Sequence, residues 1–167
     1  MKLDYPRYTP YVLLVIFLLL ASLIPGGPIE VRDFSHLKPV VVWTFNSFLT
    51  LLGFGSLALV YFLRLRRAWA YKLAIVAGLL YFILALLDLF QIFPKSPTPM
   101  TPLLFTFEVG IAILSLVLIF FAYKAQEVAG ATGGKGGAPP GMLLAAGGIL
   151  VLLTLIAVVY ASLSILR

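Results

Sequence analysis

The chain has 167 residues, of which 62% are hydrophobic and 11% are charged, and it carries a net charge of +6. So few charged residues cannot cover a water-soluble domain of this length, and the mean hydropathy of +1.11 predicts an integral membrane protein. The positive charge does not indicate nucleic-acid binding, because Lys and Arg accumulate in the cytoplasmic loops of membrane proteins generally. The absence of cysteine excludes disulfides, thiolate metal sites and thiol redox chemistry.

The first apolar run covers residues 11–24 and follows two basic residues. Such a run is either a signal peptide or a first membrane helix. Residues 25–28 (PGGP) form a helix stop and do not resemble a small-residue cleavage site. We therefore expect an uncleaved membrane helix over about 9–24, followed by a polar loop.

Three further apolar runs predict membrane spans over about 40–63, 71–93 and 102–123. The proline-rich segment 94–99 stops the third span, and Pro102 suits the first turn of the fourth. Together with the first span they predict a four-helix transmembrane bundle over residues 1–128.

Residues 129–141 are rich in Gly, Ala and Pro, which predicts a flexible linker. The uncharged run that follows, 142–167, is long enough to cross a bilayer with some tilt. We therefore predict an all-α, polytopic integral membrane helix bundle with five transmembrane helices. A cytoplasmic N-terminus places eight basic residues inside and four outside, so the positive-inside bias favours this orientation, in a plasma (inner) membrane.

A basic cluster follows the second span on the expected cytoplasmic side. Its members are Arg64, Arg66, Arg67 and Lys72. We expect it to contact anionic lipid head groups, at about 1 kcal/mol per basic side chain. Docking of a protein partner is the alternative interpretation.

Ionisable residues inside spans are the strongest functional signal, because burying one in hydrocarbon costs about 2.5 to 3.5 kcal/mol even on mild scales. Asp88 and Glu108 are the two candidates, and both lie ~7 to 9 Å below the outer edge at ~1.5 Å per residue. Asn46 falls at the same depth, and Gln91 lies one helical turn from Asp88. The sequence therefore predicts one polar layer in the outer leaflet, formed by Asn46, Asp88, Gln91 and Glu108.

This polar layer has three possible roles. Carboxylate and amide oxygens suit a hard cation, and two close carboxylates tend to hold one proton, which favours a cation or proton site. The same side chains can instead bond to one another and only hold the helices together. A site for an amphipathic ligand is the third possibility.

No catalytic constellation is evident. The only histidine, His36, lies in an expected outer loop, and neither a nucleophile with its base nor a firm metal-ligand set can be assembled. We therefore expect no enzyme activity and no cofactor.

Two hypotheses for the function remain. In the first, the chain is a small channel- or transporter-type bundle that uses the polar layer to bind a cation or proton. In the second, it is an accessory or scaffolding subunit of a larger membrane complex, in which the layer is purely structural. The expected partners are the lipid bilayer and either further copies of the chain or a larger membrane complex, but no nucleic acid.

Overall fold

The computed structural model describes residues 4–23 and 29–131. These residues contain no strand, and their four helices are α1 Tyr5–Ser22, α2 Pro39–Arg64, α3 Ala68–Leu89 and α4 Pro102–Ala131. All four are long and apolar enough to cross a membrane, which confirms the prediction of an all-α, multi-pass membrane-type bundle. The predicted fifth helix, 142–167, and the predicted linker beyond Ala131 lie outside the described residues.

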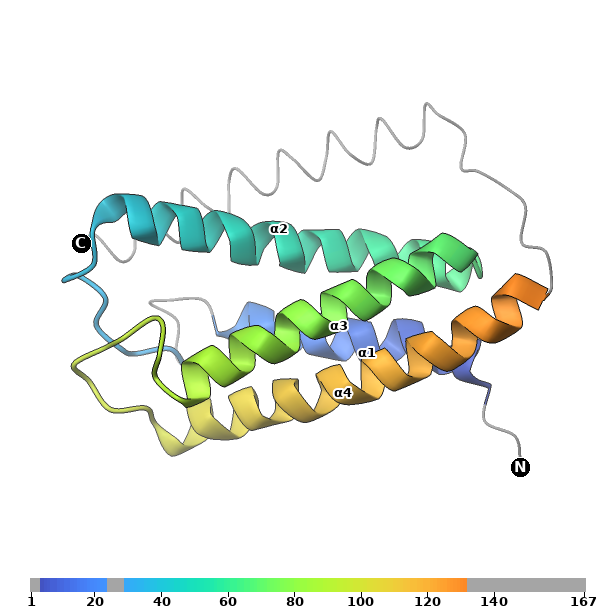
Figure 1. The fold of residues 1–167 in the computed structure, drawn as a ribbon. Helices are drawn as coiled ribbons and strands as arrows, with labels where there is room; N and C mark the ends of the chain where they lie inside the picture. Colours follow the sequence, from blue (N-terminus) through green and yellow to red (C-terminus); the bar gives the residue numbers. More distant parts are fainter. Residues whose placement is uncertain (1–3, 24–28, 132–167) are drawn as a thin grey trace.

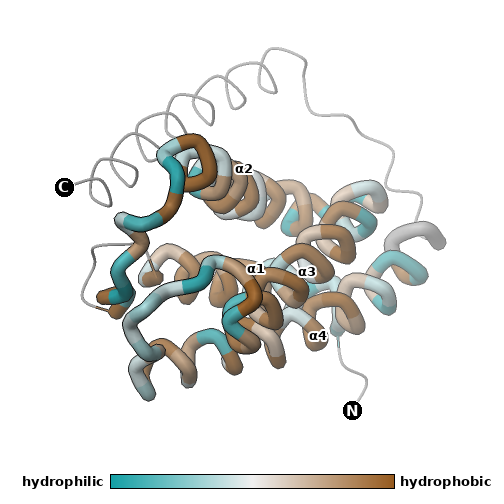
Figure 2. Tube along the Cα trace, turned by 60° about the vertical axis from the view of Figure 1, so that its left-hand side comes forward, coloured by the Kyte–Doolittle hydropathy of each residue, from teal (hydrophilic) through white to brown (hydrophobic). Residues whose placement is uncertain are grey.

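The helices run up and down, and both long connections lie at the same end of the bundle (Figure 1). We call this end the cap end, and it includes residues 29–38 and 90–101. The opposite end, the turn end, holds the short connection 65–67 between α2 and α3. Figure 2 shows that apolar residues run along the helices, whereas polar residues gather in the connections and at the helix ends.

The two connections of the cap end are tied to each other. The backbone N–H of Asp33 donates to Thr98 Oγ1 at 3.1 Å, and the Ser96 hydroxyl donates to the Asp33 carbonyl at 3.0 Å. Phe34, next to these bonds, is buried. Residues 29–38 and 90–101 therefore form a joint cover over this end of the bundle.

Proline fixes where two of the helices begin. α2 starts at Pro39 and α4 at Pro102, where the missing N–H has no helical partner and costs nothing. Both starts lie within one residue of the predicted boundaries. α4 runs on to Ala131, eight residues beyond the predicted end of its span, and Lys124 pairs with Glu127 at 3.3 Å in this extension.

α3 ends four residues before the predicted boundary, because the chain closes the helix with a Schellman motif. Gln91 takes a left-handed backbone conformation with φ of 50°, and its N–H donates to the Asp88 carbonyl at 2.8 Å. The N–H of Ile92 donates to the Leu87 carbonyl at 2.9 Å. α2 ends in the same way, with Arg66 at φ of 54°.

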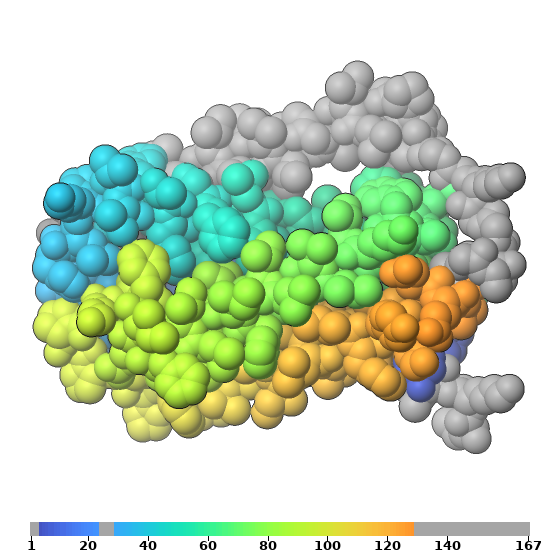
Figure 3. All heavy atoms as spheres, viewed as in Figure 1, coloured from blue at the N-terminus to red at the C-terminus, as the bar shows by residue number. Residues whose placement is uncertain are grey.

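α3 and α4 pack side by side along much of their length (Figure 3). The contact is close at Gly78, where a Cβ atom would lie 2.8 Å from Ile119 Cγ1 and 3.3 Å from the Ser115 carbonyl. Small residues elsewhere on α3 are also buried, namely Ala70, Ala74, Ala77 and Ala85. Such residues let membrane helices approach closely, since dispersion contacts and not the hydrophobic effect hold them together.

α2 packs mainly against α1 and has fewer contacts with α3. The α2–α3 contact includes two buried tyrosines of α3: Tyr81 donates to Ser56 Oγ at 3.0 Å, and Tyr71 donates to the Leu63 carbonyl at 3.3 Å. Towards the cap end the two helices diverge (Figure 1). The candidate site lies in this region.

Candidate functional site

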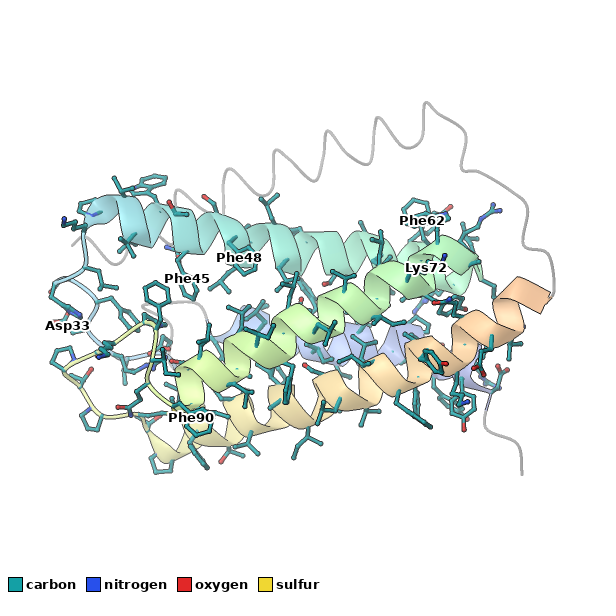
Figure 4. All side chains as sticks on the ribbon, viewed as in Figure 1. Asp33, Phe45, Phe48, Phe62, Lys72 and Phe90 are labelled. Carbon is teal, nitrogen blue, oxygen red and sulfur yellow. The ribbon has the colours of Figure 1, made fainter. Side chains whose placement is uncertain are left out.

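A cavity of about 220 Å³ lies near the cap end, and all four helices contribute to its wall. Most of the lining is apolar, and five phenylalanines belong to it, namely Phe17, Phe34, Phe45, Phe54 and Phe93. Phe45 extends from α2 towards the connection after α3 (Figure 4), where its ring meets the Phe93 ring edge-on at 5.1 Å between centroids. The charged lining consists of Glu30, Arg32, Asp88 and Glu108. The site is therefore an apolar chamber with a small charged group in its wall.

The structure brings three of the four residues of the predicted layer together. Asn46 from α2, Asp88 from α3 and Glu108 from α4 all line this cavity, and each is less than a tenth exposed. Gln91 is not among the lining residues and is exposed. Its left-handed backbone conformation ends the helix. Gln91 therefore does not lie one helical turn from Asp88 on the same face.

Arg32, from the connection before α2, is the partner of Asp88. Its two terminal nitrogens donate to the two Asp88 carboxylate oxygens at 2.7 and 2.8 Å, so the pair is bidentate. Nε of Arg32 donates to Glu30 Oε1 at 2.8 Å, and a terminal nitrogen also donates to Glu30. One guanidinium is thus held between two carboxylates, in a group with its side chains about nine-tenths buried or more.

The Arg32 guanidinium is a permanent cation in this setting. Burial by itself lowers its pKa, but the hydrogen bonds from Glu30 and Asp88 and their negative charges outweigh burial and raise the pKa above its ordinary value. The guanidinium therefore stays charged over the physiological pH range.

Sequence reasoning misses Arg32 and Glu30, because the polar composition of residues 29–39 predicts only a loop between two spans. One signal could have found them: a carboxylate in a span needs a partner, and arginine matches a carboxylate in two-point geometry better than lysine does. A search among the basic residues expected near that membrane edge would have favoured Arg32 over Lys38 and Lys95 as the partner of Asp88.

Glu108 has a different environment. It is 7% exposed and lines the same cavity as Asp88, near enough for the two carboxyl groups to interact electrostatically. The side-chain hydrogen bonds of Arg32 go to Glu30 and Asp88, and Glu108 is the third carboxyl group of the lining. The described lining thus holds three carboxyl groups and one guanidinium. This arrangement can accept an additional positive charge.

A divalent metal fits these residues poorly. Within residues 4–23 and 29–131, no three His, Cys, Asp or Glu side chains are grouped so that they could hold a metal ion. Glu30 and Asp88 direct oxygens at the Arg32 guanidinium, and His36 is exposed in the connection. The geometry suits a proton better than a divalent metal that needs six or more oxygen ligands.

The basic cluster lies at the turn end. Lys72 belongs to it and lies at the opposite end of the bundle from Asp33 (Figure 4). Arg66 makes only a long contact of 3.7 Å with Asp4, and both side chains are exposed. Arg64 and Lys72 are exposed as well. This placement is compatible with head-group contact, which stays a prediction.

Comparison with known proteins gives a family but no activity. No curated protein and no solved structure matches the chain closely enough to indicate a relationship. One family profile matches residues 5–135, which include all four described helices, and its description is a domain of unknown function. The chain therefore belongs to the family of the domain of unknown function DUF8051.

Proposed function

We propose that this protein is a small, non-enzymatic membrane protein that binds a proton or a singly charged cation in the cavity, as part of a channel- or transporter-type bundle. The observation that carries this proposal is the position of the buried Glu108 beside Asp88, in a cavity whose described lining holds a single cation, Arg32. Buried carboxyl groups that outnumber their cations are stabilised by taking up positive charge.

The carboxyl groups have separate roles in this proposal. Both oxygens of Asp88 accept hydrogen bonds from Arg32, so Asp88 is a fixed part of the wall. Glu108 lines the same cavity, but the side-chain hydrogen bonds of Arg32 go to Glu30 and Asp88. Glu108 is therefore the group that exchanges the proton or cation, and Asn46 supplies a further polar group in the same cavity.

A flux measurement tests this role of Glu108. The full chain is reconstituted into liposomes of zwitterionic lipid, and proton, Na⁺ and K⁺ movements are followed with entrapped indicator dyes. We expect Glu108→Gln to abolish the flux. The matched control is Glu127→Gln, the same chemical change at an exposed position of the same helix, which should keep it. Flux no greater than in empty liposomes, or equal in Glu108→Gln and the unchanged protein, would contradict the proposal.

We also propose a cytoplasmic N-terminus in a plasma membrane, a fifth transmembrane helix over 142–167 and assembly into an oligomer. The basic cluster at the turn end supports the orientation through the positive-inside bias. Since the chain has no cysteine, single cysteines report topology directly. With a membrane-impermeant maleimide on intact cells, Asp33→Cys should be labelled, whereas Lys72→Cys should be labelled only after permeabilisation. The opposite pattern would reverse the orientation.

The accessory-subunit hypothesis keeps one observation in its favour. Arg32 occupies both oxygens of Asp88 and also bonds Glu30, and such a saturated group can serve to fix the helices and the cap in register. Purification from native membranes in mild detergent separates the two hypotheses. An accessory subunit should bring stoichiometric partner proteins with it, whereas a complex formed only by copies of this chain favours the cation site.

A further inference from the structure

The cavity is larger and more apolar than a proton site requires. Its volume of about 220 Å³ is enclosed mainly by hydrocarbon, and aromatic rings face it from α1 and α2 as well as from the connection after α3. A few polar groups in an otherwise apolar and aromatic wall are typical of pockets for small organic molecules. The apolar part of the wall therefore favours a ligand with an apolar body.

The charged part of the wall sets the sign of the ligand's polar group. Arg32 is engaged by Glu30 and Asp88 and offers little to an anion. Glu108 and Asp88 together would repel a carboxylate or phosphate. A cationic group beside Glu108 would instead gain a charge-assisted contact, and an aromatic ring of the lining such as that of Phe45 can attract an ammonium group.

We propose that the cavity binds a small apolar organic cation, a protonated or quaternary amine that carries one hydrocarbon or aromatic body. The cationic head lies beside Glu108 and Asp88, and the body lies against the apolar wall formed by Phe17, Leu20 and Phe54. This inference rests on the proposed function, because it names the chemical class of the cation that the site takes.

Benzyltrimethylammonium is a suitable probe, since its charge does not depend on pH. The full chain is placed in nanodiscs of zwitterionic lipid, and binding of the radiolabelled probe is measured by equilibrium dialysis. We expect saturable binding with one site per chain. Neopentylbenzene, its neutral isostere, and phenylacetate, an aromatic anion, should not displace the probe at concentrations at which the unlabelled probe does. Equal displacement by the neutral isostere would overturn the inference, because the charge would then not be recognised.

Two pairs of variants locate the bound probe. Glu108→Gln should weaken binding by about tenfold or more, whereas Glu127→Gln should leave it unchanged. Leu49 lines the cavity and Leu51 is exposed on the same helix, so Leu49→Trp should abolish binding and Leu51→Trp should not. Equal effects within either pair would overturn the inference. Should a cavity variant fail to give monodisperse protein, the displacement experiment on the unchanged chain decides.

The two proposals can fail separately. Ion flux that depends on Glu108, together with no saturable binding of the probe, would contradict the proposal of an organic cation. It would still support a site for a proton or a small cation. Probe binding that depends on Glu108, without flux of any tested ion, would support the organic cation and overturn conduction. The absence of both would overturn both proposals.

Discussion

The two ends of this bundle handle charge in opposite ways. At the turn end, Arg64, Arg66 and Lys72 are exposed, while Leu63 and Tyr71 beneath them are fully buried. At the cap end, Arg32 and Asp88 are buried and paired beside a cavity. The same residue types thus serve as a solvated surface at one end and as an internal group at the other. What marks the candidate site is the burial of its charges, since the number of charges is similar at both ends.

The largest difference between the ends should appear when a basic residue is removed from each. Arg32→Met leaves Glu30 and Asp88 without their cation and should lower the free energy of unfolding by about 3 to 5 kcal/mol. Arg66→Met, at the turn end, should cost about 1 kcal/mol or less because its contact with Asp4 is long and exposed. Circular dichroism during SDS titration of detergent-solubilised protein measures both values. Equal losses would remove the distinction drawn between the ends.

The next largest loss of stability should come from a change in the packing at the centre of α3. Gly78→Ala places a Cβ atom 2.8 Å from Ile119 Cγ1 and should destabilise the protein by about 1 to 3 kcal/mol in the same SDS titration. Adding Ile119→Ala to Gly78→Ala should recover part of the loss of Gly78→Ala, measured against Ile119→Ala alone. At Gly55 a Cβ atom would meet nothing within 4 Å, so Gly55→Ala is the neutral control. A neutral Gly78→Ala would mean that α3 and α4 are less closely packed than described.

The turn end should bind anionic lipids more strongly than the cap end does. Arg64→Gln should weaken the retention of anionic lipids by about fivefold, which corresponds to about 1 kcal/mol per basic side chain. Native mass spectrometry of protein purified with its lipids counts the bound molecules. Lys38→Gln at the cap end is the control and should change nothing. Equal loss from both variants would show that the bilayer does not discriminate between the two ends.

The smallest effect concerns the α2–α3 contact. Tyr81→Phe removes the hydrogen bond to Ser56 and should cost about 0.6 kcal/mol, a typical value for such bonds between membrane helices. A double-mutant cycle with Ser56→Ala isolates this bond in the SDS titration. Tyr123→Phe, at a side chain that is largely exposed, should have no effect. A coupling energy of zero would mean that the hydroxyl pair does not hold α2 to α3.

Features set by local chemistry could be predicted from the sequence. Pro102 predicts the start of one helix, and the lengths of the apolar runs predict the spans. The rise per residue along regular helices predicts one membrane depth for Asn46, Asp88 and Glu108. In the structure all three residues line one cavity. A regular rise per residue makes such counting possible as long as the residue lies inside a helix.

Features set by tertiary contacts or by irregular backbone could not be predicted. Gln91 lies past the end of α3, where a left-handed residue other than glycine gave no sequence signal. Arg32 is separated from Asp88 by 56 residues, and neither periodicity nor hydropathy reports a contact over that distance. The cavity itself depends on how α2 diverges from α3, which follows from the packing of all four helices.

The separation between Arg32 and Asp88 also has a consequence for biogenesis. The ribosome releases Arg32 long before Asp88, so α2 and most of α3 are synthesised while the guanidinium still lacks this partner. α3 then brings a carboxylate that is costly to leave alone in hydrocarbon. Docking of the 29–38 connection onto α3 is therefore a late step of assembly. A chain that has not completed this step exposes an unpaired intramembrane acid, which is a feature that membrane quality control can recognise.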